Sequence, residues 1–401
     1  MAPAAAAAPP PAAGTLLLRL PAFLFAVWLM YWSLALGVLA TYIPVWDLKG
    51  PRNDTFYWVQ FLCGALRIKF RKRGEGQLYA GPGPALWLSN HRSWADFFVD
   101  AYLAGGRAQM LSRMMVLYAF PMFMLPVMCL RGCIVFKRGS IADKESFNKW
   151  LDDQIEASPQ VGLMVYPEGH RSMLPRSLPL KRGMLHYAYS RKLPVQIIMS
   201  GNKEAVIAEK TGVVGFGCTV VTSYSEMIAA GDYASFEEFM ARVQQLWDAE
   251  WLATMSADAA DLPPLELSGT IDNNAYPPVL LASQLAWAAV AIVLMIWTAA
   301  MSWRGLMAAT ALLGPAGQQL VVALLAGWFV TSLVFCYDTS LPKPLLNADG
   351  SLRAGGGGAD GGAADGGAAG GGAAGNGAPE APAGGKAAPA ANGLHQRKNS
   401  H

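Results

Sequence analysis

The chain has 401 residues, of which 53% are hydrophobic and only 15% are charged, and its formal net charge is +3. This composition is too apolar for an ordinary soluble protein of this length and indicates a membrane protein. The small positive excess, without a basic and aromatic recognition module, argues against a nucleic-acid partner. The five cysteines are scattered without a CxxC pair. That pattern argues against a disulfide or zinc framework and predicts reduced thiols facing the cytosol.

The N-terminal region combines a low-complexity arm with an apolar segment. Residues 1–14 are almost entirely Ala and Pro, which predicts a flexible, disordered arm. A membrane segment is predicted at 15–46, because its apolar run exceeds the roughly 20 residues that a helix needs to cross the hydrocarbon core. The next cations, Lys49 and Arg52, place its C-terminal side in the cytosol. Two prolines and a glycine within the run allow a bent, half-inserted pair of helices instead of one span.

The first polar motif is Asn-His-Arg-Ser-Trp-Ala-Asp at residues 90–96, directly after a short apolar strand predicted at 85–89. Five residues along a regular helix rotate by about 500°, so His91 and Asp96 diverge unless the helix begins between them. Ser93 followed three residues later by an acid resembles a capping box, which predicts such a start and brings Asp96 to the imidazole. A histidine oriented by a carboxylate is a general base, whereas in the alternative interpretation Asp96 only caps the helix.

Further motifs follow along the chain. The methionine-rich, aromatic stretch 110–128 predicts either a groove for a fatty chain or an ordinary buried core, because Met side chains adapt to irregular apolar ligands. Two short apolar strands then lead into polar motifs at 132–138 (Gly-Cys-Ile-Val-Phe-Lys-Arg) and 166–172 (Tyr-Pro-Glu-Gly-His-Arg-Ser). Ligands gather beyond the carboxyl ends of strands in α/β sheets. Arg138 and Arg171 therefore suit a phosphate group, although structural ion pairs are the alternative.

With a hydrophobic block at 193–198, these motifs resemble the signature of the glycerolipid acyltransferase family, which includes the lysophosphatidic acid acyltransferases. That signature consists of N-H-x4-D, G-x-x-F-x-x-R, [FY]-P-E-G-x-R and V-P-type blocks in this order. The resemblance covers roughly residues 60–225. Two positions depart from the pattern, since Val135 stands where the family has Phe and His170 stands where it usually has Thr.

The resemblance implies an acyltransferase in which His91 is the general base and Asp96 holds its tautomer. It also implies that the second and third blocks bind the glycerophosphate part of the acceptor, through Gly132, Arg138, Glu168, Gly169, Arg171 and Ser172. By its chemistry, Glu168 either orients Arg171 or accepts a bond from a substrate hydroxyl. Cys133 is interpreted as a buried side chain and not as an acyl-enzyme nucleophile.

The C-terminal third predicts a helical hairpin and a tail. Uncharged runs at 279–302 and 320–337 are each long enough to span a bilayer as transmembrane helices, and their connector carries a single cation. We expect this pair to return the chain to the cytosol. The Gly- and Ala-rich tail at 349–401 is predicted to be disordered, because it has almost no large apolar side chains. An amphipathic helix at 235–251 is expected to pack on the domain.

The predicted fold is an α/β domain over 47–270, a mixed sheet with covering helices, with transmembrane helices at both ends. The expected reaction moves a fatty acyl group from acyl-coenzyme A to the sn-2 hydroxyl of 1-acyl-glycerol-3-phosphate, giving phosphatidic acid. It needs no metal and no cofactor, since acyl-coenzyme A is a co-substrate. The expected partners are the lysophospholipid acceptor, acyl-coenzyme A and the bilayer, with the domain on the cytosolic side of the endoplasmic reticulum membrane. The alternatives are an enzyme that remodels another lysophospholipid, and a catalytically idle membrane scaffold, against which the intact His91–Asp96 pair speaks.

Overall fold

The structure is a computed structural model that describes residues 13–42, 54–137, 143–268 and 278–353. The predicted arm at 1–14, apart from its last two residues, lies outside these ranges, as does the predicted tail beyond residue 353.

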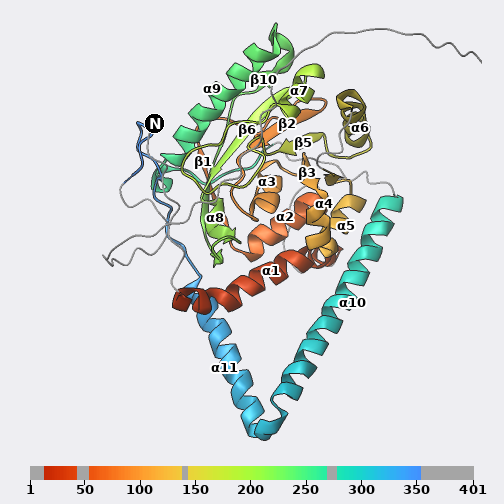
Figure 1. Cartoon of the computed structure of the whole chain (residues 1–401), viewed down its shortest axis with the longest axis vertical. Coiled ribbons are helices and arrows are strands. Elements are labelled where there is room, and N and C mark those ends of the chain that lie inside the picture. Colours follow the sequence, from red (N-terminus) through yellow and green to blue (C-terminus); the bar gives the residue numbers. More distant parts are fainter. Residues whose placement is uncertain (1–12, 43–53, 138–142, 269–277, 354–401) are drawn as a thin grey trace, which may run out of the picture. The chain divides into compact units, whose positions relative to one another are not determined.

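An eight-stranded mixed sheet forms the centre of the described domain, as the sequence predicted (Figure 1). Its strands follow the order β1-β9-β6-β2-β5-β3-β4, and β10 also pairs with β6. The bounds are β1 Lys69–Arg73, β2 Ala85–Ser89, β3 Gln109–Arg113, β4 Cys133–Phe136, β5 Gly162–Val165, β6 Pro194–Gly201, β9 Thr219–Tyr224 and β10 Ile228–Ala229. The strands from β6 through β2, β5 and β3 to β4 are parallel to their neighbours. Their carboxyl ends therefore meet at one edge of the sheet.

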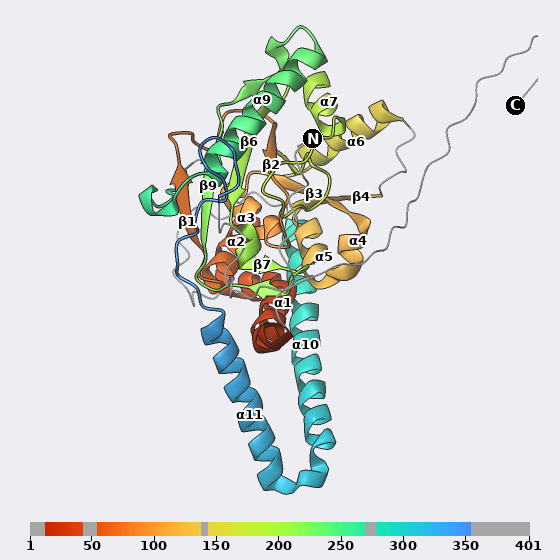
Figure 2. The ribbon, with the colours of Figure 1, turned by 60° about the vertical axis from the view of Figure 1, so that its left-hand side comes forward.

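Helices cover both faces of this sheet (Figure 2). They are α2 Asp54–Ala65, α3 Asp96–Leu103, α4 Met114–Ala119, α5 Pro121–Cys129, α6 Lys144–Glu156, α7 Gly183–Ser190, α8 Lys203–Val206 and α9 Phe236–Met255. The short strands β7 (Ile207–Ala208) and β8 (Val213–Val214) form a separate pair.

Alternation along β2 divides the interior into two cores. Trp87 packs into a core that includes residues of α2, α3 and α5, whereas Leu86 and Leu88 pack into a second core with residues of α7 and α9. Successive side chains of a strand point to opposite faces, so a strand covered on both faces is apolar throughout. This explains why β2 and β5 read as continuous apolar runs in the sequence.

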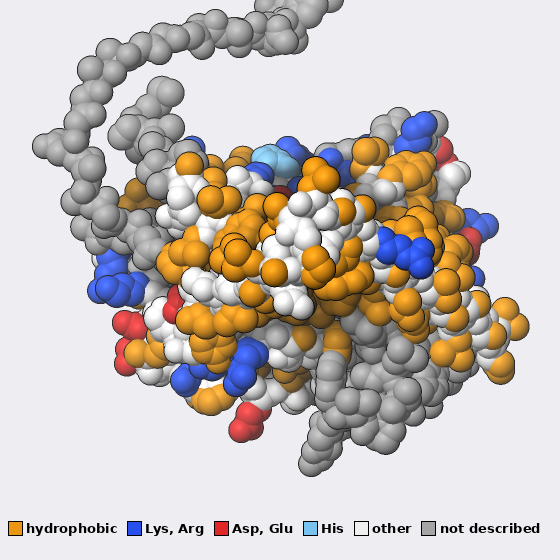
Figure 3. Space-filling model, turned by 90° about the horizontal axis from the view of Figure 1, so that it is seen from below, with side chains coloured by type: hydrophobic (Ala, Val, Ile, Leu, Met, Phe, Trp, Pro, Cys, Tyr) orange, Lys and Arg blue, Asp and Glu red, His pale blue; other side chains and the backbone are white. Residues whose placement is uncertain are grey.

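Three described helices are long and apolar enough to cross a membrane. They are α1 (Ala13–Tyr42), α10 (Pro278–Ala309) and α11 (Gly314–Phe335), and they coincide with the three apolar segments of the sequence. Large side chains of the α10–α11 hairpin are strongly exposed, among them Val293, Ile296, Leu324 and Val334. Figure 3 views the molecule from the side of this hairpin and shows a face on which hydrophobic side chains predominate. Exposed apolar surface of this extent indicates a membrane environment.

The first apolar helix lies across the hairpin and not alongside it (Figures 1 and 2). Near the N-terminal end of α1, the Ala22 N–H donates to Ser332 Oγ at 3.0 Å, and the Arg19 guanidinium lies 5.4 Å from the Phe335 ring centroid. Farther along, α1 packs against α2, α5 and α10. The helix therefore bridges the ends of α10 and α11 that lie nearest the sheet.

Candidate active site

The His91–Asp96 pair lies between the end of β2 and the start of α3. Because α3 begins at Asp96, the carboxylate of its first residue reaches back to the turn, and Asp96 Oδ2 lies 2.7 Å from His91 Nδ1. The predicted helix start between the two residues is therefore confirmed. Ser93 is not its cap, however, since the cap position is Ala95, which has no side-chain cap bond. Ser93 Oγ instead accepts the Ala95 N–H at 3.1 Å, one residue too early for a capping box.

Asp96 both caps the turn and holds the imidazole. Its Oδ2 accepts the main-chain N–H groups of Arg92 at 2.6 Å and Ser93 at 3.0 Å, besides facing His91. The carboxylate is 1% exposed. Burial acts to raise the pKa of Asp96, but the charge of Lys203, the bond to His91 and the Arg92 N–H together hold that pKa below its ordinary value. Asp96 is therefore an anion at neutral pH, as the partner of a general base must be.

The neighbouring asparagine fixes the turn to the next strand. Asn90 donates its side-chain N–H to the Ser200 carbonyl at 2.8 Å and accepts the Ser200 N–H at 3.1 Å. The His91 ring stacks on the Tyr166 ring, with the two centroids 4.2 Å apart and an interplanar angle of 12°. With Nδ1 engaged by Asp96, the remaining nitrogen, Nε2, is the one available to a ligand.

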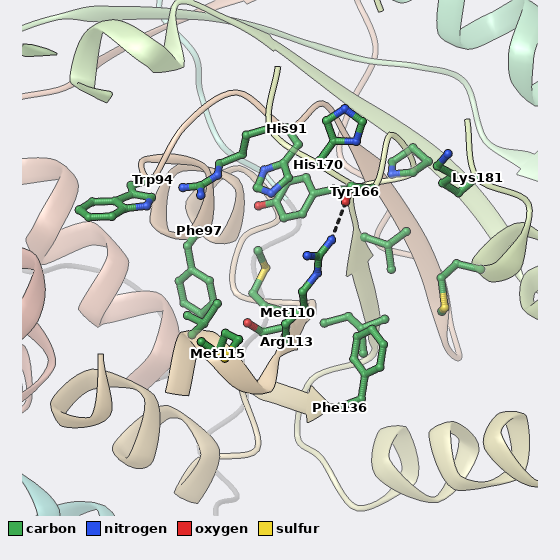
Figure 4. A pocket seen from close by; sticks show the side chains of 18 of the residues that line it. His91, Trp94, Phe97, Met110, Arg113, Met115, Phe136, Tyr166, His170 and Lys181 are labelled. Atoms are coloured by element: carbon green, nitrogen blue, oxygen red, sulfur yellow. Dashed lines mark hydrogen bonds between the residues drawn. The ribbon is translucent and has the colours of Figure 1, made fainter. Parts of the chain in front are cut away.

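A pocket of about 1080 Å³ opens beside His91 (Figure 4). Aromatic and methionine side chains make up much of its wall, including Trp58, Trp94, Phe97, Phe98, Met110, Met115, Phe120 and Phe123. The predicted groove within 110–128 is thus part of this wall, and Met30 of α1 also contributes. The other lining residues include Arg113, Lys144, His170, Arg171, Lys181, His186 and Lys210. Among the described lining residues none is Asp or Glu, so the pocket suits a ligand with an apolar chain and an anionic group.

The third sequence block forms the turn after β5 and contributes its members in different ways. Gly169 adopts a positive φ of 78°, which glycine tolerates, and its carbonyl accepts a bond from Arg113 at 2.9 Å (Figure 4). Ser172 donates its N–H to the His91 carbonyl at 2.8 Å. The block therefore braces the turn that carries His91.

Glu168 has a different role from the one predicted. Its side chain is fully buried, and its two oxygens accept main-chain N–H groups, from His91 at 3.0 Å and from Leu178 at 2.8 Å. It does not line the pocket. The prediction that Glu168 orients Arg171 is wrong, because both carboxylate oxygens bind main-chain donors and Arg171 pairs with Glu209. A bond between Glu168 and a substrate hydroxyl stays a prediction.

The position of Arg171 fits the ion pair that was the alternative interpretation, and it leaves the predicted phosphate contact open to a ligand. It lines the pocket, and it also forms an ion pair with Glu209 at 2.6 Å. Its side chain remains 32% exposed. Lys210 lines the pocket beside it and donates to the Arg171 carbonyl at 3.1 Å. A ligand phosphate at this place would therefore share the guanidinium with Glu209.

The second block is mostly structural where it is described. Gly132 is buried and does not line the pocket, and a Cβ there would lie 3.0 Å from Thr55 Oγ1, which indicates a packing role. Its part in substrate binding stays a prediction. Cys133 is buried, as predicted, and burial raises the pKa of its thiol. A thiol in this state is a poor nucleophile. Arg138 lies outside the described residues.

Two cations near the pair were not singled out from the sequence. Arg113, at the end of β3, supports the Gly169 turn, and Lys203, directly after β6, lies beneath Asp96. The rule that parallel strands present their carboxyl ends at one edge would have pointed to both, but the order of the strands was unknown. Among the described residues, no group of three or more His, Cys, Asp or Glu side chains is placed to hold a metal ion.

The chain is similar to known proteins over its central part. The family model described as Acyltransferase matches residues 69–200, which include all three polar blocks. The 1-acyl-sn-glycerol-3-phosphate acyltransferase of Saccharomyces cerevisiae is 26% identical over 169 residues, or 41% of this chain and 53% of the relative. The chain thus spans about half the length of this curated relative. The crystal structure of the 1-acyl-sn-glycerophosphate acyltransferase from Thermotoga maritima is 15% identical, with a TM-score of 0.43, over 59% of this chain and 95% of that chain.

Proposed function

Because residues 69–200 match the family model described as Acyltransferase, we propose that the protein moves a fatty acyl group from acyl-coenzyme A to the sn-2 hydroxyl of 1-acyl-glycerol-3-phosphate. The product is phosphatidic acid. The observation that carries the proposal is the His91–Asp96 pair at an apolar pocket whose charged lining side chains are cationic. A lysophospholipid with a phosphate group and a thioester with a fatty chain both match this combination.

The chemistry follows from the arrangement of the pair. His91 Nε2 accepts the proton of the acceptor hydroxyl while that oxygen attacks the thioester carbonyl. The new C–O bond forms, the C–S bond breaks, and the proton passes from His91 to the departing coenzyme A sulfur. Asp96 holds the reactive tautomer and stabilises the imidazolium. General-base help of this kind contributes about 10²- to 10⁴-fold, and positioning supplies much of the remainder.

The apolar and the cationic regions of the pocket wall suggest where each part of the substrates would bind. The aromatic side chains Trp58, Phe97 and Phe123 would contact the fatty chain, whose burial releases about 0.8 kcal/mol per methylene group. Arg171 and Lys210 would hold the acceptor phosphate through charge-assisted bonds. The thioester carbon must then lie near His91, between these two regions.

We propose that α10 and α11 span the bilayer and that α1 lies at its surface on the domain side. This fits the contacts of α1 with the ends of α10 and α11 nearest the sheet, and Met30 then links the pocket to the membrane surface. The C-terminal end of α11 also returns to the domain, since the Phe216 N–H donates to the Cys336 carbonyl at 2.8 Å. The domain would face the cytosol, and the expected membrane is that of the endoplasmic reticulum.

The test is an acceptor panel assayed on full-length protein in purified membranes with labelled oleoyl-coenzyme A. We expect transfer to lysophosphatidic acid to exceed transfer to lysophospholipids with larger headgroups, and His91→Ala to abolish it without loss of protein. Near-normal turnover by His91→Ala would overturn the mechanism. Preference for a larger headgroup would favour the remodelling alternative, and no transfer to any acceptor would favour the scaffold.

A further inference from the structure

A buried lysine lies directly beneath the His91–Asp96 pair. Lys203 follows β6, whose carboxyl end reaches the same sheet edge as β2, and its side chain is fully buried. Its Nζ lies 3.0 and 2.9 Å from the two carboxylate oxygens of Asp100 and 3.4 Å from Asp96 Oδ1. It also donates to the Asn90 carbonyl at 2.7 Å. The ammonium group thus touches both carboxylates of α3 and the main chain that leads into His91.

The two aspartates compete for this one cation. They are four residues apart on α3 and share one face of the helix, where like charges repel. The two carboxylate oxygens of Asp96 have different partners. Oδ2 bonds His91 and the main chain of the turn, whereas Oδ1 faces Lys203. Burial, opposed by the charge of Lys203, raises the pKa of Asp100 to about 6. The cluster of Asp96, Asp100 and Lys203 therefore carries two negative charges and one positive charge when Asp100 is ionised.

The other charged and titratable groups around the cluster do not replace Lys203. Arg92, from the loop before α3, is paired with Glu204 of α8, with its Nε 3.1 Å from a Glu204 carboxylate oxygen. Glu168 accepts main-chain N–H groups. The Tyr166 ring lies 5.9 Å from Lys203 Nζ, and burial together with Asp100 and Asp96 raises the pKa of its hydroxyl, so that it stays neutral. Arg92 also interacts electrostatically with Asp96, but among the described residues Lys203 is the lysine or arginine that forms an ion pair with it.

We propose that Lys203 is a positioning residue that, in opposition to Asp100, sets the pH at which the His91–Asp96 pair releases its proton. The reason is electrostatic. The pair acts as a base only when His91 is neutral and Asp96 is charged, and a buried carboxylate in that state needs a counter-charge. Without Lys203, the pair would retain a proton to higher pH, because the imidazolium would be the remaining partner of Asp96. The inference rests on the proposed function only where activity serves as the readout.

The geometry predicts opposite changes in the proton-release midpoint for two substitutions. Lys203→Met keeps most of the volume and removes the positive charge, so the midpoint should rise. Asp100→Asn keeps the shape and removes a negative charge, so the midpoint should fall. A charge within about 4 to 6 Å of a titratable group moves the pKa of that group by about 1 to 3. The double variant Lys203→Met/Asp100→Asn has one negative charge, the same net charge as the native cluster, and should return close to the native midpoint.

Two measurements on the full-length protein test these signs from about pH 5 to about pH 9, which brackets the titration of histidine. The first is the pH profile of kcat/KM for acyl transfer. The second is carbethoxylation by diethyl pyrocarbonate, which modifies the neutral imidazole, followed by mass spectrometry of the peptide that contains His91. His170 and His186 lie on other segments and serve as internal references. If the midpoint of Lys203→Met rises by about one pH unit, kcat/KM well below both midpoints should fall by about tenfold and recover at high pH.

The carbethoxylation midpoints remain informative if no acceptor is found, so failure of the proposed function is distinguishable from failure of the role of Lys203. Unchanged midpoints in the folded variants would overturn the role of Lys203. The role would also be overturned if the single variants lost activity by the same factor at every pH and the double variant did not regain it. That pattern would indicate that Lys203 only supports the fold. If Lys203→Met does not fold, Asp100→Asn carries the test, and a midpoint that stays or rises overturns the proposal.

Discussion

Substitution of Glu168 distinguishes two roles of this residue, which are to brace the His91 turn or to bind the acceptor. Its carboxylate is fully buried and accepts the N–H groups of His91 and Leu178. A bond to a charged group contributes about 1.5 to 3 kcal/mol, so Glu168→Ala should lose about 3 to 6 kcal/mol of stability. That is a large part of the roughly 5 to 15 kcal/mol typical of a domain, and the variant should accumulate poorly.

Glu168→Gln is the informative variant, because it keeps the shape and one oxygen acceptor. The amide must turn its NH₂ toward one of the two main-chain donors, so one bond is lost. We expect a loss of about 2 to 3 kcal/mol, or a fall of about 4 to 12 °C in Tm for a domain of this size. If the turn shifts His91 by about 1 Å, kcat should fall by about 100-fold with little change in the KM of the acceptor.

The assay combines thermal melting in detergent with steady-state kinetics for both substrates. Arg171→Ala is the matched control, since its side chain is partly exposed at the pocket and its loss should change acceptor binding with little change in Tm. A Glu168→Gln protein with native Tm and kcat but a raised acceptor KM would refute the reasoning and return Glu168 to the acceptor site.

Three other predictions follow from the site and the fold. Arg171→Ala should raise the acceptor KM by about 10- to 150-fold, and Arg171→Lys should restore it only in part. Glu209→Gln should leave that KM unchanged or lower it. Unchanged lysophosphatidic acid kinetics in Arg171→Ala would contradict the assignment of Arg171 to the acceptor phosphate. Cys133→Ala should keep most of the activity, since burial raises the pKa of the thiol, and a thioester trapped on Cys133 would establish a two-step mechanism instead. A protease site placed after Gly350 should be cut in sealed microsomes, and protection until detergent is added would contradict a cytosolic domain.

Local sequence patterns were sufficient to predict those parts of the site whose geometry depends on residues close together in the chain. The approach of Asp96 to His91 follows from where a helix can begin, and the strands followed from apolar runs and their polar ends. The burial of Glu168 could not be predicted, because a carboxylate beside a turn resembles a surface group and the His91 N–H that it accepts comes from 77 residues away. The close packing of Gly132 was equally hidden in the sequence, since its neighbour Thr55 belongs to α2, far away along the chain.

The same limit applies to longer distances in the chain. A lysine after a strand is usually solvated, and only the pairing of β6 with β2 brings Lys203 to Asp100. Hydropathy likewise reports how apolar α1 is but not its direction, which is decided by contacts such as that between Ala22 and Ser332.

The apolar pocket and the buried charges beneath it have a common cause. The apolar wall shields most of the His91 ring, whose side chain is 24% exposed, and the polar groups that orient this ring mainly bind one another. Asp96 bonds main-chain N–H groups and faces Lys203, Arg92 pairs with Glu204, and Glu168 holds the turn. Charges removed from water interact more strongly than charges at a surface, so their positions determine the proton affinity of the base. Substitutions beneath the pocket should therefore change the pH dependence of the reaction, whereas substitutions in its wall should change which lipid enters.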